Sequence, residues 1–495
     1  MTESPLLHQR FLRGLALAPR RPAVRFGGRA LSYEELHEIA LRWAGLLTAR
    51  ARRPPGVVGV LAEKGTTAYA GILAGLYSGA TVVPMDPSFP PPRIRWMLED
   101  ARVETVLADG PGRAALAATG VDVPVLSPAE SDGAAGAPSE PAAAARDSAY
   151  VLFTSGSTGR PKGVRLTDAN LAAYFRTFDA RYAFAPEDVF SQTLGLNFDC
   201  SLVDMFGAWA AGSAVQVVSG QAFGDLPGFA AEHGLTVWFS TPSAIALVRR
   251  MGGLRPGALP GLRLSYFAGE ALLCSDAEQW QRATGGVVEN LYGPTELTIT
   301  VTGHRYSPRT RELAVNGLVP IGRVHEGHDR VLLGPDGEPA EDEGELCVTG
   351  AQMSPGYLDP EQDRGRFVEM AGRTWYRTGD RVRLLPGGEL AYLGRSDSQV
   401  QVHGLRVELS EVDQAVRELP GVTDAVTVPV TAGGTTELAV YYTGERTAPV
   451  VLARLLRERL PAGMVPRRLE HLAEFPLNAN RKVDRGLLAE RAAGS

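Results

Sequence analysis

The sequence predicts an α/β protein with two parts: a large N-terminal domain of layered α/β subdomains plus a β-rich subdomain, and a small α+β C-terminal domain. Three observations support this prediction. The first half alternates short apolar runs with helical patterns, which is typical of parallel sheets covered by helices. From about Val319 to Tyr392, short strands are separated by glycines, and the segment after residue 396 again mixes helices and strands. A chain of 495 residues is also too long for one ordinary hydrophobic core.

The first elements can be placed from their local patterns. Ser32 and Glu35 have the spacing of a capping box, and the apolar residues that follow recur every three or four positions. This pattern predicts an amphipathic helix over residues 32–47. Short buried strands with helices between them are predicted at residues 57–63, 81–86 and 103–109.

The C-terminal part is predicted to be a separate small unit. We place the boundary near Asp397, which assigns residues 1–396 to the N-terminal domain and residues 397–495 to the C-terminal domain. Ser410 is expected to cap the first helix of the small unit. Two strands at 424–430 and 437–444 and a helix at 449–460 are expected to follow. Low-complexity residues 127–147 are predicted to be a surface connection.

Composition excludes several classes of function. The net charge is −6, from 50 basic and 56 acidic residues without a long block of one sign, so nothing favours nucleic-acid binding. No stretch approaches the roughly 20 apolar residues that span a bilayer, and we expect no membrane partner. The three cysteines are far apart, which argues against a disulfide framework or a thiolate zinc site. We therefore expect a cytoplasmic protein.

Residues 150–164, YVLFTSGSTGRPKGV, contain the strongest local motif. An apolar strand leads into a loop of small residues, whose backbone N–H groups and hydroxyls can approach an anion, and Lys162 adds positive charge. Pro161 precedes Lys162, whereas a Walker loop has Gly-Lys-Ser/Thr opening a helix. We predict a phosphate-binding loop of another kind, made by Thr154, Ser155, Gly156, Ser157, Thr158 and Gly159.

Further segments complete a resemblance that extends from about Leu31 to Arg485. In chain order they are LSYEEL, LAGLYSGATVVPMDPSFP, NFDCSLVDMF, FAGEAL, NLYGPTEL, GELCVTG, YRTGD, GRSDSQVQVHGLRVEL and NANRKVDR. With TSGSTGRPKG, they resemble the adenylate-forming superfamily of acyl-CoA ligases, luciferases and peptide-synthetase adenylation domains, and the peptide-synthetase branch most. The resemblance implies an AMP-forming ligase that uses ATP and Mg²⁺, with a mobile C-terminal domain.

The resemblance also implies roles for individual residues around ATP. Glu296 is similar to the family's magnesium ligand, which suits a hard cation that prefers oxygen. Asp380 resembles the carboxylate that accepts hydrogen bonds from both ribose hydroxyls. Lys482 resembles the catalytic lysine, and Arg481 stands where the family usually has glycine. The implied catalytic set is Lys482, Glu296, Thr158 and Lys162. The other implied nucleotide contacts are Asn290, Tyr292, Gly293, Thr295, Tyr392 and Arg395.

In the implied substrate site, Asp199 matches the aspartate that pairs with the ammonium group of an amino acid. A buried acid needs a cationic partner, which a fatty acyl group cannot provide. The side-chain pocket would be formed by Cys200, Val203, Phe239, Tyr266, Ala268, Gly269, Leu291, Ile299 and Thr300. No charged residue is among them and Phe239 and Tyr266 are bulky, so we expect a small neutral amino acid such as alanine, serine, glycine or 2-aminobutyrate.

Asp397 resembles the family's hinge between adenylation and thiol transfer, and Gly404 would line the path of the pantetheine arm. We see no Gly-Gly-x-Ser-type attachment segment and no condensation motif, and expect a free carrier protein with a phosphopantetheine arm as acceptor. Four alternatives stay open: a β-amino-acid substrate, a D-amino acid as in D-alanine–carrier protein ligases, an acyl-CoA ligase that uses coenzyme A, and a non-catalytic nucleotide-binding protein.

Overall fold

The computed structural model describes residues 6–49, 56–126, 141, 148–156, 160–395, 399–432, 435–476 and 483–493. The predicted surface connection at 127–147 lies outside this part of the chain except for Pro141. The predicted domain boundary also lies outside it and stays a prediction.

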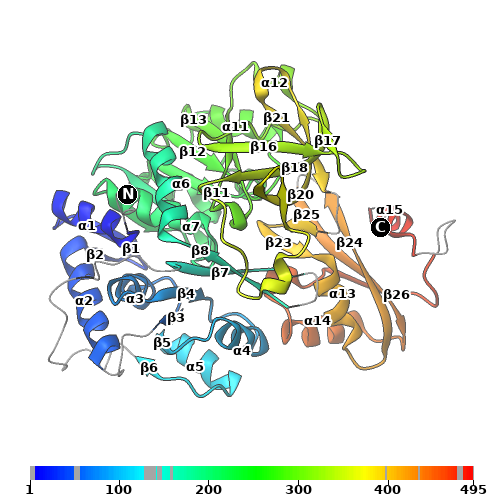
Figure 1. The fold of residues 1–495 in the computed structure, drawn as a ribbon, viewed down its shortest axis with the longest axis horizontal. Helices are drawn as coiled ribbons and strands as arrows, with labels where there is room; N and C mark the ends of the chain where they lie inside the picture. The colour runs from blue at the N-terminus through cyan, green and yellow to red at the C-terminus, as the bar shows by residue number, and fades with distance from the viewer. Residues whose placement is uncertain are drawn as a thin grey trace.

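Two sheets with helices form the bulk of the N-terminal domain (Figure 1). One has the strand order β6-β5-β3-β4-β7-β8 and the other β15-β14-β13-β12-β11-β9-β10-β1-β2. The strands of the first are β3 (Val57–Leu61), β4 (Thr81–Met85), β5 (Thr105–Ala108), β6 (Val125–Leu126), β7 (Tyr150–Thr154) and β8 (Lys162–Leu166). Those of the second are β1 (Pro22–Phe26), β2 (Arg29–Ser32), β9 (Val189–Gln192), β10 (Ala214–Val217), β11 (Val237–Ser240), β12 (Leu264–Phe267), β13 (Val287–Tyr292), β14 (Thr302–Arg305) and β15 (Arg323–Val324).

Helices cover both faces of these sheets. The α-helices are α1 (His8–Leu17), α2 (Tyr33–Ala49), α3 (Thr66–Tyr77), α4 (Pro91–Asp100), α5 (Gly110–Thr119), α6 (Asp168–Arg181), α7 (Cys200–Leu202), α8 (Ala208–Ala210), α9 (Leu226–His233), α10 (Ser243–Arg250), α11 (Cys274–Thr284) and α12 (Thr310–Leu313). Successive side chains of a strand point to opposite faces of its sheet, so the first sheet separates two apolar clusters. Val82 packs in the cluster under α2 and α3, and Val83 packs in the cluster under α4 and α5. The parallel sheet predicted from these strands is confirmed, since β3 pairs in parallel with both β4 and β5.

The predicted capping box is also confirmed. The Glu35 carboxylate accepts a hydrogen bond from the Ser32 backbone N–H at 2.7 Å, and the Glu35 N–H donates to the Ser32 hydroxyl at 3.2 Å. These bonds satisfy donors that the first turn of a helix leaves without intrahelical partners.

A β-rich subdomain follows, as its glycine-punctuated sequence predicts. Its strands are β16 (His328–Leu333), β17 (Pro339–Ala340), β18 (Glu343–Gly350), β19 (Phe367–Met370), β20 (Arg373–Leu384) and β21 (Leu390–Arg395). All their pairings are antiparallel. Its apolar cluster includes Leu297 and Val301, so this subdomain packs against the segment that follows β13.

The C-terminal unit combines a hairpin, a sheet and helices. Its elements are β22 (Gln399–Val402), β23 (Leu405–Glu408), α13 (Leu409–Arg417), β24 (Val422–Ala432), β25 (Thr435–Gly444), α14 (Pro449–Arg457), β26 (Arg468–His471) and α15 (Arg485–Ala493). The predicted Ser410 cap is wrong. Because β23 runs directly into α13, the extended residue Glu408 precedes the helix and Ser410 lies inside its first turn.

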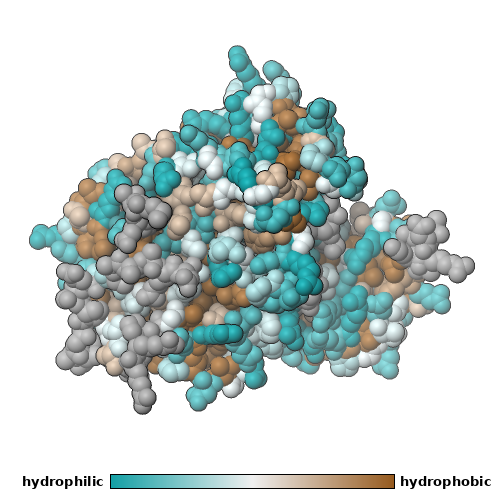
Figure 2. All heavy atoms as spheres, viewed as in Figure 1, coloured by the Kyte–Doolittle hydropathy of each residue, from teal (hydrophilic) through white to brown (hydrophobic). Residues whose placement is uncertain are grey.

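The surface fits this layered core. On the face shown in Figure 2, hydrophobic residues form separate patches between hydrophilic ones. Among the helices that the structure describes, none is both long and apolar enough to cross a membrane.

Candidate active site

The predicted substrate residues meet at the carboxyl ends of three parallel strands, β11, β12 and β13. Phe239 pairs in register with Tyr266 on the neighbouring strand, and their rings meet edge to face at 5.7 Å. This end of a parallel sheet is where α/β proteins usually bind ligands. One core cluster joins the apolar residues of the predicted pocket, which we call the acyl cluster: Cys200, Val203, Phe239, Tyr266, Ala268, Leu291 and Ile299.

Asp199 lies just before α7, which continues into a π-helical turn (Val203–Gly207). Its residue exposure is 8%, its Oδ2 atom has no hydrogen-bond partner in the described structure, and its side chain does not cap the helix. Burial raises the pKa of Asp199 to about 6, against hydrogen bonds from Thr295 and Cys200 that lower it. A buried acid with an unpartnered oxygen fits a cationic ligand group.

The loop after the YGPTEL motif holds two β-branched residues in a strained conformation. Thr298 and Ile299 have φ angles of 56° and 75°, which β-branched side chains rarely adopt. The side-chain amide of Gln352 donates to the backbone carbonyls of Leu297, Thr298 and Thr300 at 3.2, 3.2 and 2.8 Å. The backbone carbonyl of Gln352 accepts a hydrogen bond from the Thr298 hydroxyl at 2.6 Å. Gln352 therefore holds the turn that positions Ile299 and Thr300, a role that our sequence analysis missed.

Replacing Gln352 by leucine should raise the KM for the amino acid by at least about tenfold, because the two buried N–H donors of the amide are lost, each worth about 1 kcal/mol, and three backbone carbonyls of the turn lose their partner. The KM for ATP should change less. Steady-state kinetics against both substrates checks this. Gln216→Leu is the matched control, since among the described residues the Gln216 amide donates only to Val217 on β10. Equal effects of the two substitutions on the amino-acid KM would contradict the role of Gln352.

The predicted phosphate loop joins two antiparallel strands, β7 and β8, so Lys162 begins a strand. A Cβ atom at Gly156 would lie 2.0 Å from the Arg160 carbonyl oxygen, so only glycine fits this close approach. The Ser155 hydroxyl is buried without a partner in the described structure, and the Lys162 ammonium lies 5.3 Å from the ring centre of Tyr357. Ser157, Thr158 and Gly159 lie outside the described residues.

Glu296 is buried beside this loop. Its carboxylate accepts a hydrogen bond from the Tyr357 hydroxyl at 2.6 Å and pairs with Arg406 at 3.0 Å. Burial would raise the pKa of Glu296, but the Arg406 guanidinium and hydrogen bonds outweigh it, and the pKa lies below its usual value. The described residues contain no group of three His, Cys, Asp or Glu that could hold a metal. One carboxylate with phosphate oxygens and water is nevertheless a usual setting for Mg²⁺. The chemistry of Glu296 fits such a site, and in this structure Arg406 is the cation that pairs with it.

The predicted nucleotide residues are also adjacent. The Tyr292 hydroxyl donates to Asp380 at 2.6 Å and Arg395 donates to the other oxygen of Asp380 at 2.8 Å. The side-chain amide of Asn290 donates to the backbone carbonyls of Val319 and Pro320. Its side-chain oxygen is therefore the atom that could accept a hydrogen bond from a ligand. Tyr392 packs against the same apolar cluster as Tyr292. A Cβ atom at Gly293 would lie 2.6 Å from the Thr300 Cα atom.

The C-terminal unit contacts this site through its hairpin and α13. Gly404, between β22 and β23, donates to Glu270 at 2.7 Å and lies against Thr241. Glu411 pairs with Arg93 at 2.8 Å and accepts a hydrogen bond from the Gly156 N–H. Our sequence analysis did not select Arg406 or Glu411, although Arg406 lies within the quoted motif GRSDSQVQVHGLRVEL.

Asp397 and Lys482 lie outside the described residues. The residues flanking the Lys482 segment, Phe475 and Val483, pack against the cluster of β24, β25 and α15. In Figure 1, α15 lies at the outer end of the C-terminal unit, away from β7 and β8. In this arrangement the hairpin reaches Glu296 beside the phosphate loop through Arg406, and α15 does not lie near that loop (Figure 1).

Comparisons with known proteins identify the family and the fold of the chain. Residues 11–358 match the family described as AMP-binding enzyme. The chain is 33% identical over 505 residues to enterobactin synthase component F of Shigella flexneri, covering 96% of this chain but only 38% of that protein. Among solved structures, it is similar to IdnL7, with 50% identity, a TM-score of 0.77 and 99% of both chains covered.

It is also similar to the Vibrio cholerae adenylation domain AlmE in complex with glycyl-adenosine-5'-phosphate. The identity is 28%, the TM-score is 0.89, and 100% of this chain and 99% of that one are covered. The chain belongs to the AMP-binding enzyme family, and within it the chain is related to the adenylation domains of nonribosomal peptide synthetases. The fold class predicted from the sequence is confirmed.

Proposed function

We propose that this enzyme activates a small neutral amino acid with ATP and transfers it to the phosphopantetheine thiol of a carrier protein in the cytoplasm. The observation that carries the proposal is Asp199, a buried carboxylate with an unpartnered oxygen beside the acyl cluster. Its hydrogen bond with Thr295 connects the proposed ammonium site to the proposed phosphate site. The glycyl-adenylate bound by AlmE supports a small substrate.

In the first step, a carboxylate oxygen of the amino acid attacks the α-phosphorus of ATP. The new O–P bond forms as the bond to the leaving oxygen breaks, and pyrophosphate departs. Catalysis of this kind depends mostly on positioning and charge neutralisation. Lys162 and the phosphate loop would bind the phosphates, Asp380 the ribose, and Lys482 the transferring group. Glu296 would hold Mg²⁺, which neutralises phosphate charge.

In the second step, the carrier thiolate attacks the carbonyl carbon of the aminoacyl adenylate, and AMP departs as the thioester forms. Gly404 packs against Thr241 beside Glu270 and is proposed to line the path of the pantetheine arm. Rotation of the C-terminal unit about Asp397 would move the hairpin away from the phosphate site and bring Lys482 to it. A small unit with its own core suits such a movement.

ATP–pyrophosphate exchange across a panel of acids tests the proposal. The panel includes both alanine enantiomers, glycine, serine, 2-aminobutyrate, β-amino acids, tryptophan, glutamate and propionate. We expect the highest kcat/KM for alanine or a small neighbour and at least about 100-fold less for propionate, which lacks the ammonium group that Asp199 would pair with. Best turnover of tryptophan, glutamate or propionate would contradict the proposal.

A further inference from the structure

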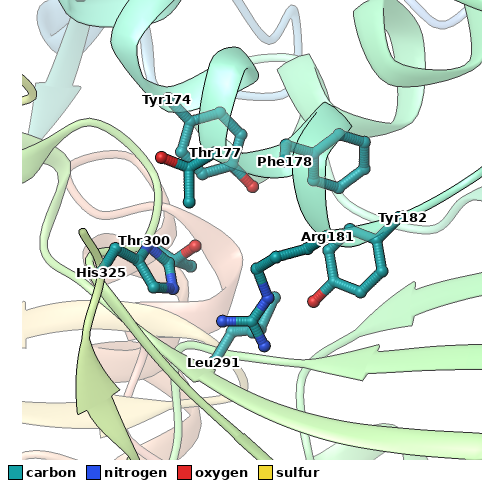
Figure 3. A pocket seen from close by; sticks show the side chains of 8 residues that line it. All are labelled: Tyr174, Thr177, Phe178, Arg181, Tyr182, Leu291, Thr300 and His325. Carbon is teal, nitrogen blue, oxygen red and sulfur yellow. The ribbon is translucent and has the colours of Figure 1, made fainter.

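A small pocket lies next to the acyl cluster and shares Leu291 with it (Figure 3). Its lining comes from α6 and the residues just after it, from Leu291 and Thr300 of the predicted substrate site, and from His325. Because Leu291 and Thr300 belong to both the pocket and the predicted substrate site, the pocket suits an extension of a substrate side chain better than a separate ligand.

Tyr174 belongs both to this pocket and to the surroundings of Asp199. Its side chain is buried, lines the pocket, and forms a hydrogen bond with Thr300. The phenol also lies close enough to Asp199 and Cys200 for their charges to raise its pKa, in addition to burial. The Tyr174 ring stacks on Phe178 at 6.0 Å, which holds its orientation. Tyr174 therefore separates the ammonium end of the acyl cleft from the pocket behind it.

The Arg181 guanidinium inside the pocket shares one carboxylate, that of Glu289, with Arg305, which pairs with it at 2.8 Å. Arg181 pairs with Glu289 at 2.7 Å, and the Tyr182 hydroxyl also hydrogen-bonds that carboxylate. A carboxylate entering the pocket would therefore compete with Glu289 for the guanidinium.

His325 provides ring nitrogens that can hydrogen-bond a group bound in the pocket. The residue is 8% exposed, and neither ring nitrogen has a hydrogen-bond partner in the described structure. Burial and the charge of Arg181 lower the pKa of His325 to about 3, so the ring is neutral and offers one donor and one acceptor. Figure 3 shows His325 and Thr300 together on one side of the pocket, opposite Arg181 and Tyr182. A primary amide, which also donates and accepts, matches this ring.

We propose that Tyr174 is a specificity-determining residue of the amino-acid site: with Thr300 it closes the acyl cleft against the His325 pocket and restricts the substrate to a small side chain. Removing the Tyr174 side chain joins the two spaces. The enlarged site then accepts longer neutral side chains, and His325 favours a terminal amide among them. This inference rests on the proposed amino-acid activation.

The test is ATP–pyrophosphate exchange with alanine, methionine, glutamine and glutamate on the full chain. For Tyr174→Ala, the kcat/KM ratio of glutamine to alanine should rise at least about tenfold, the scale that shape discrimination in a pocket reaches. Tyr174→Phe loses only the hydroxyl and should keep the ratio within about threefold of the wild type. Thr177→Val is the matched control, because it changes the pocket lining but leaves Tyr174 and Thr300 in place. It should also keep the ratio of glutamine to alanine.

A second comparison tests His325. The double variant Tyr174→Ala with His325→Leu should still accept methionine but lose its advantage for glutamine. If Tyr174→Ala does not fold, as judged by thermal melting, Tyr174→Leu should show a smaller shift in the same direction. A proportional loss of activity for all four amino acids in a folded variant would overturn the inference. Absence of amino-acid-dependent exchange in the wild type would instead overturn the proposed function.

Discussion

Replacing Asp199 by asparagine should lower kcat/KM for alanine in pyrophosphate exchange by about a thousandfold. The substituted amide keeps the shape of the side chain but cannot neutralise the substrate ammonium, and breaking a buried ion pair on one side typically costs about 3–5 kcal/mol. Each 1.4 kcal/mol corresponds to about a factor of ten. The measurement is exchange kinetics at saturating ATP.

A matched control separates this effect from general damage to the fold. Asp276 on α11 is equally buried, but its carboxylate pairs with Arg249 and lies in a different core region from the acyl cluster. Asp276→Asn should leave kcat/KM for alanine within about threefold of the wild type. Undiminished exchange in Asp199→Asn would contradict the assignment of the ammonium site.

Replacing Gly404 by leucine should lower the rate of aminoacyl transfer by at least about 100-fold while pyrophosphate exchange stays within several-fold of the wild type. Gly404 has a φ angle of 79°, and a Cβ atom there would lie 2.3 Å from the Thr241 Cγ2 atom. A larger residue is therefore both strained and in collision when the hairpin occupies the position seen here. Single-turnover transfer from preformed aminoacyl adenylate to a thiol acceptor measures the effect.

Lys482→Ala should give the opposite result. It should abolish adenylate formation yet leave transfer from supplied aminoacyl adenylate nearly intact, because only the first step is assigned to Lys482. Equal impairment of both steps in Gly404→Leu, or unimpaired adenylation in Lys482→Ala, would contradict this account. In it, aminoacyl transfer is assigned to the hairpin at Gly404 and adenylate formation to Lys482.

The sequence allowed local patterns to be interpreted correctly, and its ordered motifs identified the family. The Ser32–Glu35 capping box and the parallel strands near the N-terminus follow from short-range spacing. The motif resemblance selected Asp199, which the fold does place beside the acyl cluster. The helix after β23 was misplaced because a serine favours a cap only when the backbone there is free, and here the preceding strand determines where the helix begins.

Long-range partners could not be predicted in the same way. Gln352 lies more than fifty residues from the turn that it holds, and its role depends on positive φ angles that no local pattern indicates. Tyr174 looks like an ordinary apolar position of an amphipathic helix, and only the folded structure places it between Asp199 and the His325 pocket. The ion pair between Arg406 and Glu296 likewise depends on how the hairpin packs against the N-terminal domain, which no local pattern predicts.

The recognition of the substrate ammonium by Asp199 can be measured directly with two non-hydrolysable adenylate analogues. Sulfamoyl analogues of alanyl-AMP and propionyl-AMP differ only by the amino group, and calorimetry gives the Kd of each for the wild type and for Asp199→Asn. The alanyl analogue should bind the wild type at least about 100-fold more tightly, and the variant should lose most of that difference. Equal binding of the two analogues by the wild type, or an unchanged difference in the variant, would contradict amino-acid recognition at this site.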